Sequence, residues 1–177
     1  IKYKKFKYLW IGYNMAYAAI TKPEVNFNTK IYTGNGSTQN ITGLDFQPDL
    51  IWYKRRDTSN HNRLINSVRG SNKNLSSDQT AGENTESTYV TSFNSDGWSI
   101  GSNSDVNASS SSMVAWTWKA NGAGSSNSDG STASTVSANT AAGFSMFQFT
   151  GTNGNTTVGH GLGGVPEMFM IKNTAQA

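Results

Sequence analysis

Two segments of the chain repeat the same order of residues, and this repetition limits what the chain can fold into. "FNTKIYTGNG" begins at Phe27, and "FSMFQFTGTNG" begins at Phe144, 117 residues later. The match continues through a glycine and a proline in each copy, which are Gly43 and Pro48, then Gly161 and Pro166. Each copy is typical of a strand, a Gly/Asn turn, a second short strand, a proline break and an apolar strand. We therefore expect residues 27–54 and 144–172 to follow the same strand-turn-strand path.

The rest of the chain has the same β character. No window keeps apolar residues at helical spacing for more than a turn. Alternating β-forming residues predict strands over 29–33, 50–54, 63–68, 89–93, 98–101, 113–119, 132–137, 144–150 and 168–172. "TYVTSFNSDGWSIGS" predicts a hairpin with Tyr89, Thr91 and Phe93 on one face. Short strands with frequent turns indicate an all-β fold, an antiparallel β-sandwich of the jelly-roll or concanavalin-like kind.

The repeat predicts how the chain is divided. Residues 25–120 are expected to form a first β-sandwich module, which is long enough to bury a core. Residues 144–177 match only the start of a second, truncated module, so the sequence is expected to be part of a longer tandem protein. Between them, residues 121–143 have the Gly/Ser/Asn-rich composition of a flexible connection, although alternation over 132–137 predicts a weak strand there.

Residues 1–24 form a leader whose charge differs from that of the rest. Lysines crowd its first seven residues, whereas the chain from Met15 onward has nearly equal numbers of basic and acidic side chains. The leader is either a secretory signal that lacks its first residues or sequence translated upstream of a true start at Met15. Its interrupted apolar stretch favours upstream translation and is too short for a membrane span. On that interpretation, residues 1–14 make few contacts with the sandwich.

Most motifs of catalysis are missing from the sequence. The absence of cysteine excludes disulfides, thiol catalysis and cysteine zinc sites. "GHGLGG" at 159–164 satisfies a dinucleotide-binding pattern literally, but a proline and an apolar run follow it instead of a helix, so these glycines are interpreted as turn residues. The sequence also lacks a nucleophile elbow, a zinc-protease motif and the paired acids of a sandwich-fold glycosidase. We therefore expect a non-enzymatic protein without a cofactor.

Metal binding is not expected either. The two histidines, His61 and His160, both lie in loops and fit exposed or turn-bonded imidazoles better than zinc ligands. Asp96, Asp105 and Asp129 could offer oxygen ligands to calcium, but they lack the spacing of a calcium loop. The turn chemistry of aspartate explains them more simply.

A first candidate contact surface is basic. Its residues are Arg55, Arg56, Arg63 and Lys73, with Lys54 and Arg69 nearby and a single acid, Asp57, among them. Such a patch could attract phosphate, acidic glycans or a partner subunit. A solvated loop after a strand is the simpler interpretation, and the sparse aromatic residues argue against nucleic acid.

A second candidate surface is aromatic. Trp116 and Trp118 share one face of "MVAWTWKA", and Trp52 lies with Leu50 on one face of "LIWYK". Exposed indole rings of this kind stack on sugar rings. A small sandwich without cysteine needs its tryptophans for stability, however, so we expect Trp52, Trp116 and Trp118 in the core.

The chain as a whole resembles a tandem-repeat domain family of virion and tail structural proteins of tailed bacteriophages, often marine phages. The resemblance spans Met15 to Ala177 and rests on the order of "MAYAAITKP", "FNTKIYTGNGSTQNITGLDFQPDLIWYK", "TSFNSDGWSIGS", "MVAWTWKA" and "GFSMFQFTG". It implies a homo-oligomeric tail or tail-fibre component in the virion, whose loops contact other subunits or a host surface glycan. It implies no catalytic or ligand residues. The alternative is a secreted carbohydrate-binding, lectin-like module of a bacterial protein.

Overall fold

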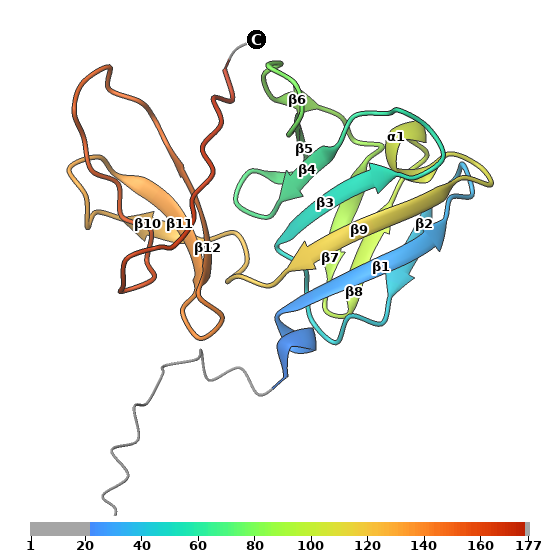
Figure 1. Ribbon diagram of the computed structural model, residues 1–177, viewed down its shortest axis with the longest axis horizontal. Helices are drawn as coiled ribbons and strands as arrows, with labels where there is room; N and C mark the ends of the chain where they lie inside the picture. Colours follow the sequence, from blue (N-terminus) through green and yellow to red (C-terminus); the bar gives the residue numbers. More distant parts are fainter. Residues whose placement is uncertain (1–21, 176–177) are drawn as a thin grey trace, which may run out of the picture.

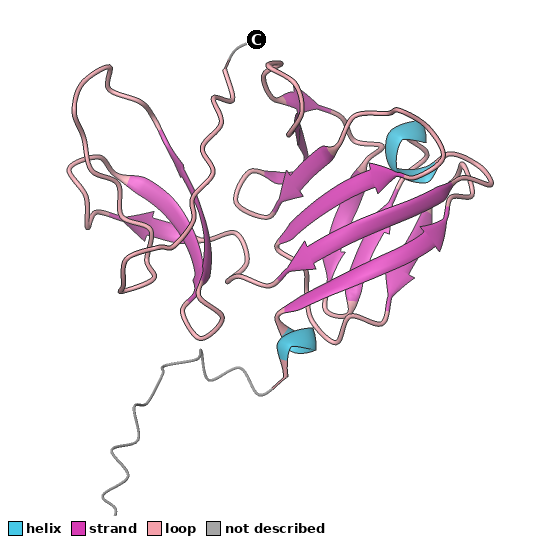
Figure 2. Cartoon of the chain, viewed as in Figure 1, coloured by secondary structure: helices cyan, strands magenta, loops and turns pink. Residues whose placement is uncertain are grey.

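The computed structural model describes residues 22–175. Figure 2 shows strands joined by loops, with only two short helices, η1 (Pro23–Val25) and α1 (Ser104–Asn107), in the described part. The expectations for the leader, including the choice between a signal and a start at Met15, fall mostly on residues 1–21 and lie outside the described residues.

Two antiparallel sheets pack face to face (Figure 1). The larger has the order β1-β9-β3-β4-β5-β6 and consists of β1 (Phe27–Thr33), β9 (Ser112–Trp118), β3 (Leu50–Arg55), β4 (Arg63–Asn66), β5 (Gly70–Ser76) and β6 (Asn84–Thr85). The smaller has the order β2-β8-β7 and consists of β2 (Gln39–Thr42), β8 (Gly97–Ile100) and β7 (Val90–Asn94). The predicted antiparallel β-sandwich is confirmed.

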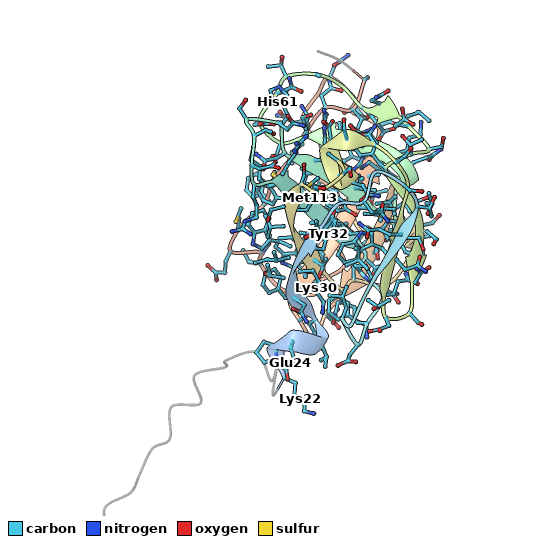
Figure 3. The ribbon with its side chains drawn as sticks, turned by 90° about the vertical axis from the view of Figure 1, so that its right-hand side faces the viewer. Lys22, Glu24, Lys30, Tyr32, His61 and Met113 are labelled. Atoms are coloured by element: carbon cyan, nitrogen blue, oxygen red, sulfur yellow. The ribbon has the colours of Figure 1, made fainter. Side chains whose placement is uncertain are left out.

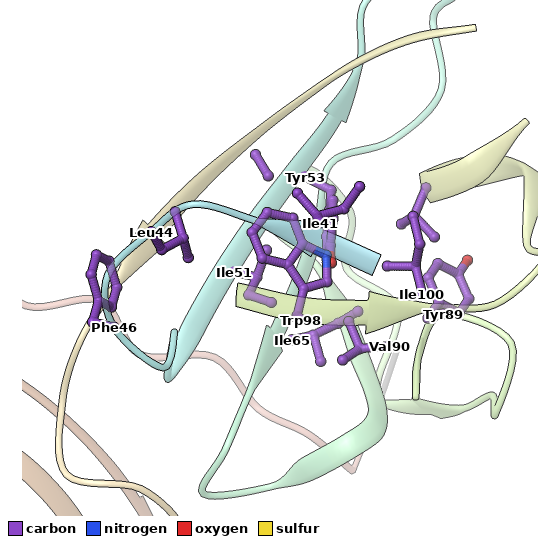
Figure 4. Close-up of a cluster of buried hydrophobic side chains, with 12 residues drawn as sticks. Ile41, Leu44, Phe46, Ile51, Tyr53, Ile65, Tyr89, Val90, Trp98 and Ile100 are labelled. Atoms are coloured by element: carbon purple, nitrogen blue, oxygen red, sulfur yellow. The ribbon is translucent and has the colours of Figure 1, made fainter. Parts of the chain in front are cut away.

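The core lies between these two sheets (Figure 4). Strand β3 contributes Ile51 and Tyr53, and β8 contributes Trp98 and Ile100, all at most 1% exposed. Ala115 of β9 reaches the same cluster because successive side chains of a strand point to opposite faces of its sheet. The alternation read from the sequence therefore predicted correctly which residues of β3 and β9 share a face.

The predicted hairpin is present as β7 and β8, but it contains a bulge. The register shifts between Val90 and Ser92, and Thr91 is exposed while Tyr89 and Val90 are both buried. The expected common face of Tyr89, Thr91 and Phe93 is thus wrong at its middle residue. A bulge places an extra residue opposite one partner residue, so the side-chain alternation changes phase at that point.

Residues 121–143 belong to a third, smaller sheet. It has the order β10-β11-β12 and consists of β10 (Ser125–Asn127), β11 (Ser134–Asn139) and β12 (Phe144–Phe149). The weak strand expected over 132–137 is confirmed as β11. The sheet is attached to the sandwich by hydrogen bonds from Asn139 Nδ2 to Asn26 Oδ1 at 2.9 Å and to the Lys119 carbonyl at 3.3 Å.

The expected strand over 168–172 is wrong, and the two sequence copies share a strand only at their beginnings. β12 starts at Phe144 as β1 starts at Phe27, but residues 168–172 form no strand. Their counterpart β3 is hydrogen-bonded to β9 on one side and to β4 on the other. In the described part of the chain, residues 168–172 pair with no strand, and an apolar segment without a neighbouring strand has no partners for its backbone groups.

Candidate functional site

The face of the six-stranded sheet that points away from the core carries three tryptophans. On β9, Met113, Ala115 and Thr117 are buried, and the alternate residues Trp116 and Trp118 are half-buried on the other face. The strand register places Trp52 of β3 directly opposite Trp116. Trp52, Trp116 and Trp118 therefore come together from two adjacent strands, as their shared faces in the sequence suggested.

This placement corrects the expectation that these tryptophans build the core. Their half-buried rings lie outside the core cluster, and the tryptophan in that cluster is Trp98. The physical reason is the pairing of the sheets, because the smaller sheet packs on the Ala115 side of β9, and Trp116 and Trp118 point to the opposite side. Local alternation defines two faces but does not say which of them meets the second sheet.

The three indoles line a shallow hollow of about 310 Å³ together with Asn62. The rings of Trp52 and Trp116 meet edge to face, with centroids 6.2 Å apart and planes at 70°. Asn62 lies next to the first residue of β4, so its amide stands at the same end of the sheet as the basic loop. His61, which marks this end in Figure 3, lies far from Glu24 of η1, which precedes β1. The volume is near the lower end of the range for small-molecule sites.

Trp118 is held between aromatic rings of two other strands. Its ring centroid lies 4.9 Å from that of Phe27 on β1. On the other side it stacks on Phe144 of β12, with centroids 6.1 Å apart and planes at 23°. These contacts fix the orientation of one wall of the hollow and connect it to the small sheet.

The lining determines what the hollow can bind. Indole faces present large apolar surfaces with a negative quadrupole, which suits the C–H face of a sugar ring. The Asn62 amide offers both a donor and an acceptor. Since no charged side chain lines the hollow, its chemistry favours a neutral ligand that combines an apolar face with hydroxyl groups.

The four basic candidates are each bonded to a partner within the protein. Arg55 Nε lies 2.7 Å from Asp57 Oδ1, and Arg56 Nη1 donates to Ser112 Oγ at 2.9 Å. Arg63 Nη2 lies 2.7 Å from Asp105 Oδ2, and Lys73 Nζ lies 3.6 Å from Glu83 Oε1. Sequence reasoning missed Asp105 and Glu83 as partners because both lie outside the basic stretch. The fold therefore balances much of the charge that the sequence concentrates there.

Asp105 is the centre of the largest of these networks. Its carboxylate accepts hydrogen bonds from Arg63 Nε at 3.0 Å, Tyr89 Oη at 2.6 Å and Asn60 Nδ2 at 3.0 Å. Burial raises the pKa of Asp105, but the hydrogen bonds from Tyr89 and Arg63 outweigh it and hold that pKa below its ordinary value. Burial and the same bond raise the pKa of the Tyr89 hydroxyl. The network joins β4, α1 and the residue that precedes β7.

We expect this network to make the protein sensitive to acid. An aspartate whose pKa is lowered by folding stabilises the folded state above its unfolded pKa of about 3.9, and that contribution is lost as the pH falls through the lower folded pKa. Asp105→Asn should lower the free energy of unfolding at pH 7 by about 2 kcal/mol, because charged hydrogen bonds are lost. Urea unfolding at pH 7 and pH 3 measures both effects. The difference between wild type and variant should shrink at pH 3, and a constant difference would contradict the assignment. Tyr89→Phe removes one of the donors, so its free energy of unfolding at pH 7 should lie between those of wild type and Asp105→Asn.

His160 forms a bond within its own turn, whereas His61 and Asp96 bond to residues of other loops. His61 Nδ1 lies 3.2 Å from Asp78 Oδ2, and His160 Nδ1 accepts from the Leu162 amide at 3.2 Å. Asp96 accepts from the backbone amides of Gly43 and Asp45, which lowers its pKa. Among residues 22–175, no group of three or more histidine and acidic side chains is arranged to hold a metal ion. No helix in this range is long and apolar enough to cross a membrane.

Comparison with known proteins gives one match. The family described as "Domain of unknown function (DUF7483)" matches residues 22–177. The matched range includes both sheets of the sandwich, the small sheet and all residues that line the hollow. No curated protein and no solved structure matches the chain.

Proposed function

The chain belongs to the family described as Domain of unknown function (DUF7483), and we propose that its sandwich is a non-enzymatic module that binds a glycan in the aromatic hollow. The observation that carries the proposal is the grouping of Trp52, Trp116 and Trp118 on the outer face of the six-stranded sheet. Burying an indole ring stabilises a protein by about 2–3 kcal/mol. Three indoles that stay half-buried outside the core are therefore better explained by contact with a ligand than by stability of the core.

The contents of the hollow support binding without turnover. Hydrolysis of a glycosidic bond needs two carboxyl groups that flank the bond. The hollow offers three indoles and one amide instead. These groups hold and orient a sugar ring but transfer no proton to it.

We propose further that the module is part of a phage tail or tail fibre and that the glycan belongs to the host surface. The support is the resemblance in motif order described above. A contact with a dissociation constant of about 1 mM gives only about −4 kcal/mol, but linked copies on a homo-oligomer raise the effective concentration of each further contact. A secreted lectin-like module would use the same hollow, and mass spectrometry of purified virions distinguishes the two. Absence of the protein from virions would leave the secreted alternative.

Replacement of the central indole tests the site. We expect Trp116→Ala to weaken glycan binding about 30-fold, which corresponds to about 2 kcal/mol for the loss of a central aromatic contact. A panel of neutral polysaccharides and host-surface glycans can be titrated while intrinsic tryptophan fluorescence is recorded. The matched control is Met168→Ala, which removes an apolar side chain that is 82% exposed and does not line the hollow.

Two outcomes would contradict the proposal. Binding that is equally strong in wild type and Trp116→Ala would show that the hollow is not the glycan site. Release of reducing ends from any glycan, abolished by Trp116→Ala, would show that the module is an enzyme. The folded state of each variant is checked by circular dichroism before titration, so that a loss of binding is not confused with unfolding.

A further inference from the structure

The most exposed apolar segment of the chain lies near its end, in the second sequence copy. Val165, Met168 and Phe169 are 93%, 82% and 75% exposed, and Met170 and Ile171 are 55% and 62% exposed. The counterparts of residues 168–171 in the first copy belong to β3, whose alternate side chains lie in the core. A contiguous exposed apolar run of this kind marks an interaction surface.

The turn before this segment has the same left-handed φ angles in both copies. Gly43 and Asp45 have positive φ angles of 83° and 62°, and the matched residues Gly161 and Gly163 have φ angles of 71° and 73°. A non-glycine residue with positive φ is uncommon, so Asp45 shows that this turn demands the conformation. The two copies therefore share their first strand and the positive φ angles of this turn. Where the first copy has β2 the second has only an isolated bridge at Val158, and where the first copy has β3 the second has no strand.

Strand β9 explains the divergence. In the first copy β9 lies between β1 and β3, and Trp118 is opposite Phe27 on one side and Leu50 on the other. In the second copy β12 is the outermost strand of its sheet, and residues 168–171 pair with no strand in the described part of the chain. No strand in the described part of the chain pairs with β12 and residues 168–171 together, as β9 pairs with β1 and β3.

We propose that the free edge of β12 and residues 165–171 accept a β-strand of the β9 type from another module of this kind. The β9 of this chain cannot serve, because it is paired along its whole length with β1 and largely with β3. The donor is antiparallel to both segments and alternates as Ser112–Trp118 does, with small or apolar residues on one face and Val and Trp on the other. This is strand addition to an open sheet edge.

The side chains of the acceptor fit such a donor. In the first copy the large Ile51 and Tyr53 stand opposite the small Thr117 and Ala115 of β9. At the matched positions of the acceptor stand Phe169 and Ile171, which are again large and apolar. Large residues opposite small ones on neighbouring strands fill the layer between sheets without overlap.

The acceptor is anchored at its far end. Lys172 Nζ donates to the Gln79 carbonyl at 2.9 Å, and the Glu83 amide donates to the Thr174 carbonyl at 2.8 Å. Figure 1 shows this segment, in red, running between the small sheet and the edge of the sandwich at β5 and β6. A segment held at one end loses less conformational freedom when a strand binds to it.

The test adds the missing strand as a peptide. A peptide with the sequence of residues 111–121, extended by lysines for solubility, is titrated into the whole chain while amide hydrogen exchange is followed. We expect exchange in residues 168–172 and in β12 to slow by about tenfold or more at saturation, because paired amides are protected. The same peptide with proline in place of Ala115 should protect neither segment, since proline removes a ladder hydrogen bond.

Chain variants separate pairing from general hydrophobic attraction. Phe169→Asp should abolish the protection by the peptide, whereas Ile31→Asp, at an equally apolar residue that is 65% exposed on β1, should leave it unchanged. Absence of protection, or equal protection by the proline peptide, would overturn the proposal. Protection of residues 168–172 that rises with chain concentration in the absence of peptide would also overturn it, because the occupant would then be a second copy of the same segment. The proposal does not depend on glycan binding in the hollow.

Discussion

Trp98→Ala should destabilise the sandwich more than any other substitution of a tryptophan on β3, β8 or β9. Trp98 is fully buried at the centre of the core, where its ring meets that of Tyr53 edge to face at a centroid distance of 6.0 Å (Figure 4). The ring of Tyr32 also meets it edge to face, at 6.3 Å. Removal of such a ring leaves a cavity that the surrounding side chains cannot fill, at a cost of about 3–5 kcal/mol. Domains of this size are stable by about 5–15 kcal/mol, so this loss removes a large share of the free energy of unfolding, and we expect the variant to be close to unfolding at 37 °C. Urea unfolding followed by circular dichroism measures the loss.

The matched control is Trp116→Ala on the outer face of the larger sheet. Its ring is half-buried and lies outside the core cluster, so we expect less than half of the loss seen for Trp98→Ala. Equal losses for the two variants would show that the outer face is as important for stability as the core. That outcome would also remove the main reason for assigning the outer tryptophans to binding.

Gly97→Ala should be the most damaging of the glycine substitutions on the smaller sheet. Gly97 has a φ of +148°, and a Cβ atom there would lie 1.9 Å from the Ile41 carbonyl oxygen. The carbonyl belongs to β2, which pairs with β8 through Thr42 and Gly97, so relief of the overlap requires the two strands to separate. Strained backbone costs about 1–3 kcal/mol and overpacking costs a further 1–3 kcal/mol. We expect a loss of about 2–6 kcal/mol in urea unfolding.

Gly122→Ala controls for the backbone conformation alone. Gly122 has a φ of +65°, and nothing lies within 4 Å of the position of an added Cβ. Only the strain of a left-handed alanine remains, which is about 1–2 kcal/mol. If Gly97→Ala lowered the free energy of unfolding no more than Gly122→Ala, the inference that β2 lies too close to Gly97 for a Cβ atom would be wrong.

On the proposed function, the two faces of β9 separate stability from glycan binding. Met113, Ala115 and Thr117 are buried on the inner face of the larger sheet, and Trp116 and Trp118 line the hollow on the opposite face. Because the faces alternate residue by residue, a substitution on one face changes the environment of the other only through the backbone. The stability and binding measurements on this strand are therefore expected to separate cleanly.

Several features could be predicted from the sequence because they depend on neighbouring residues only. Alternation has a period of two, so Trp116 and Trp118 had to share a face once β9 was a strand. The turn at Asp96 and Gly97 predicted the hairpin of β7 and β8, since these residues suit tight turns. The lack of helical spacing likewise predicted that the regular secondary structure is almost entirely strands.

Other features were decided by contacts between residues far apart in the chain. Trp98 lies in the core and Trp116 outside it, although both belong to alternating strands, because the pairing of the sheets selects which face is covered. Arg63 forms an ion pair with Asp105, which lies far away in the sequence, in α1. Residues 168–172 have the composition of a strand but form none in the described structure. Composition gives a segment the tendency to extend, but a strand exists only where a second strand accepts its hydrogen bonds, and that partner comes from tertiary structure.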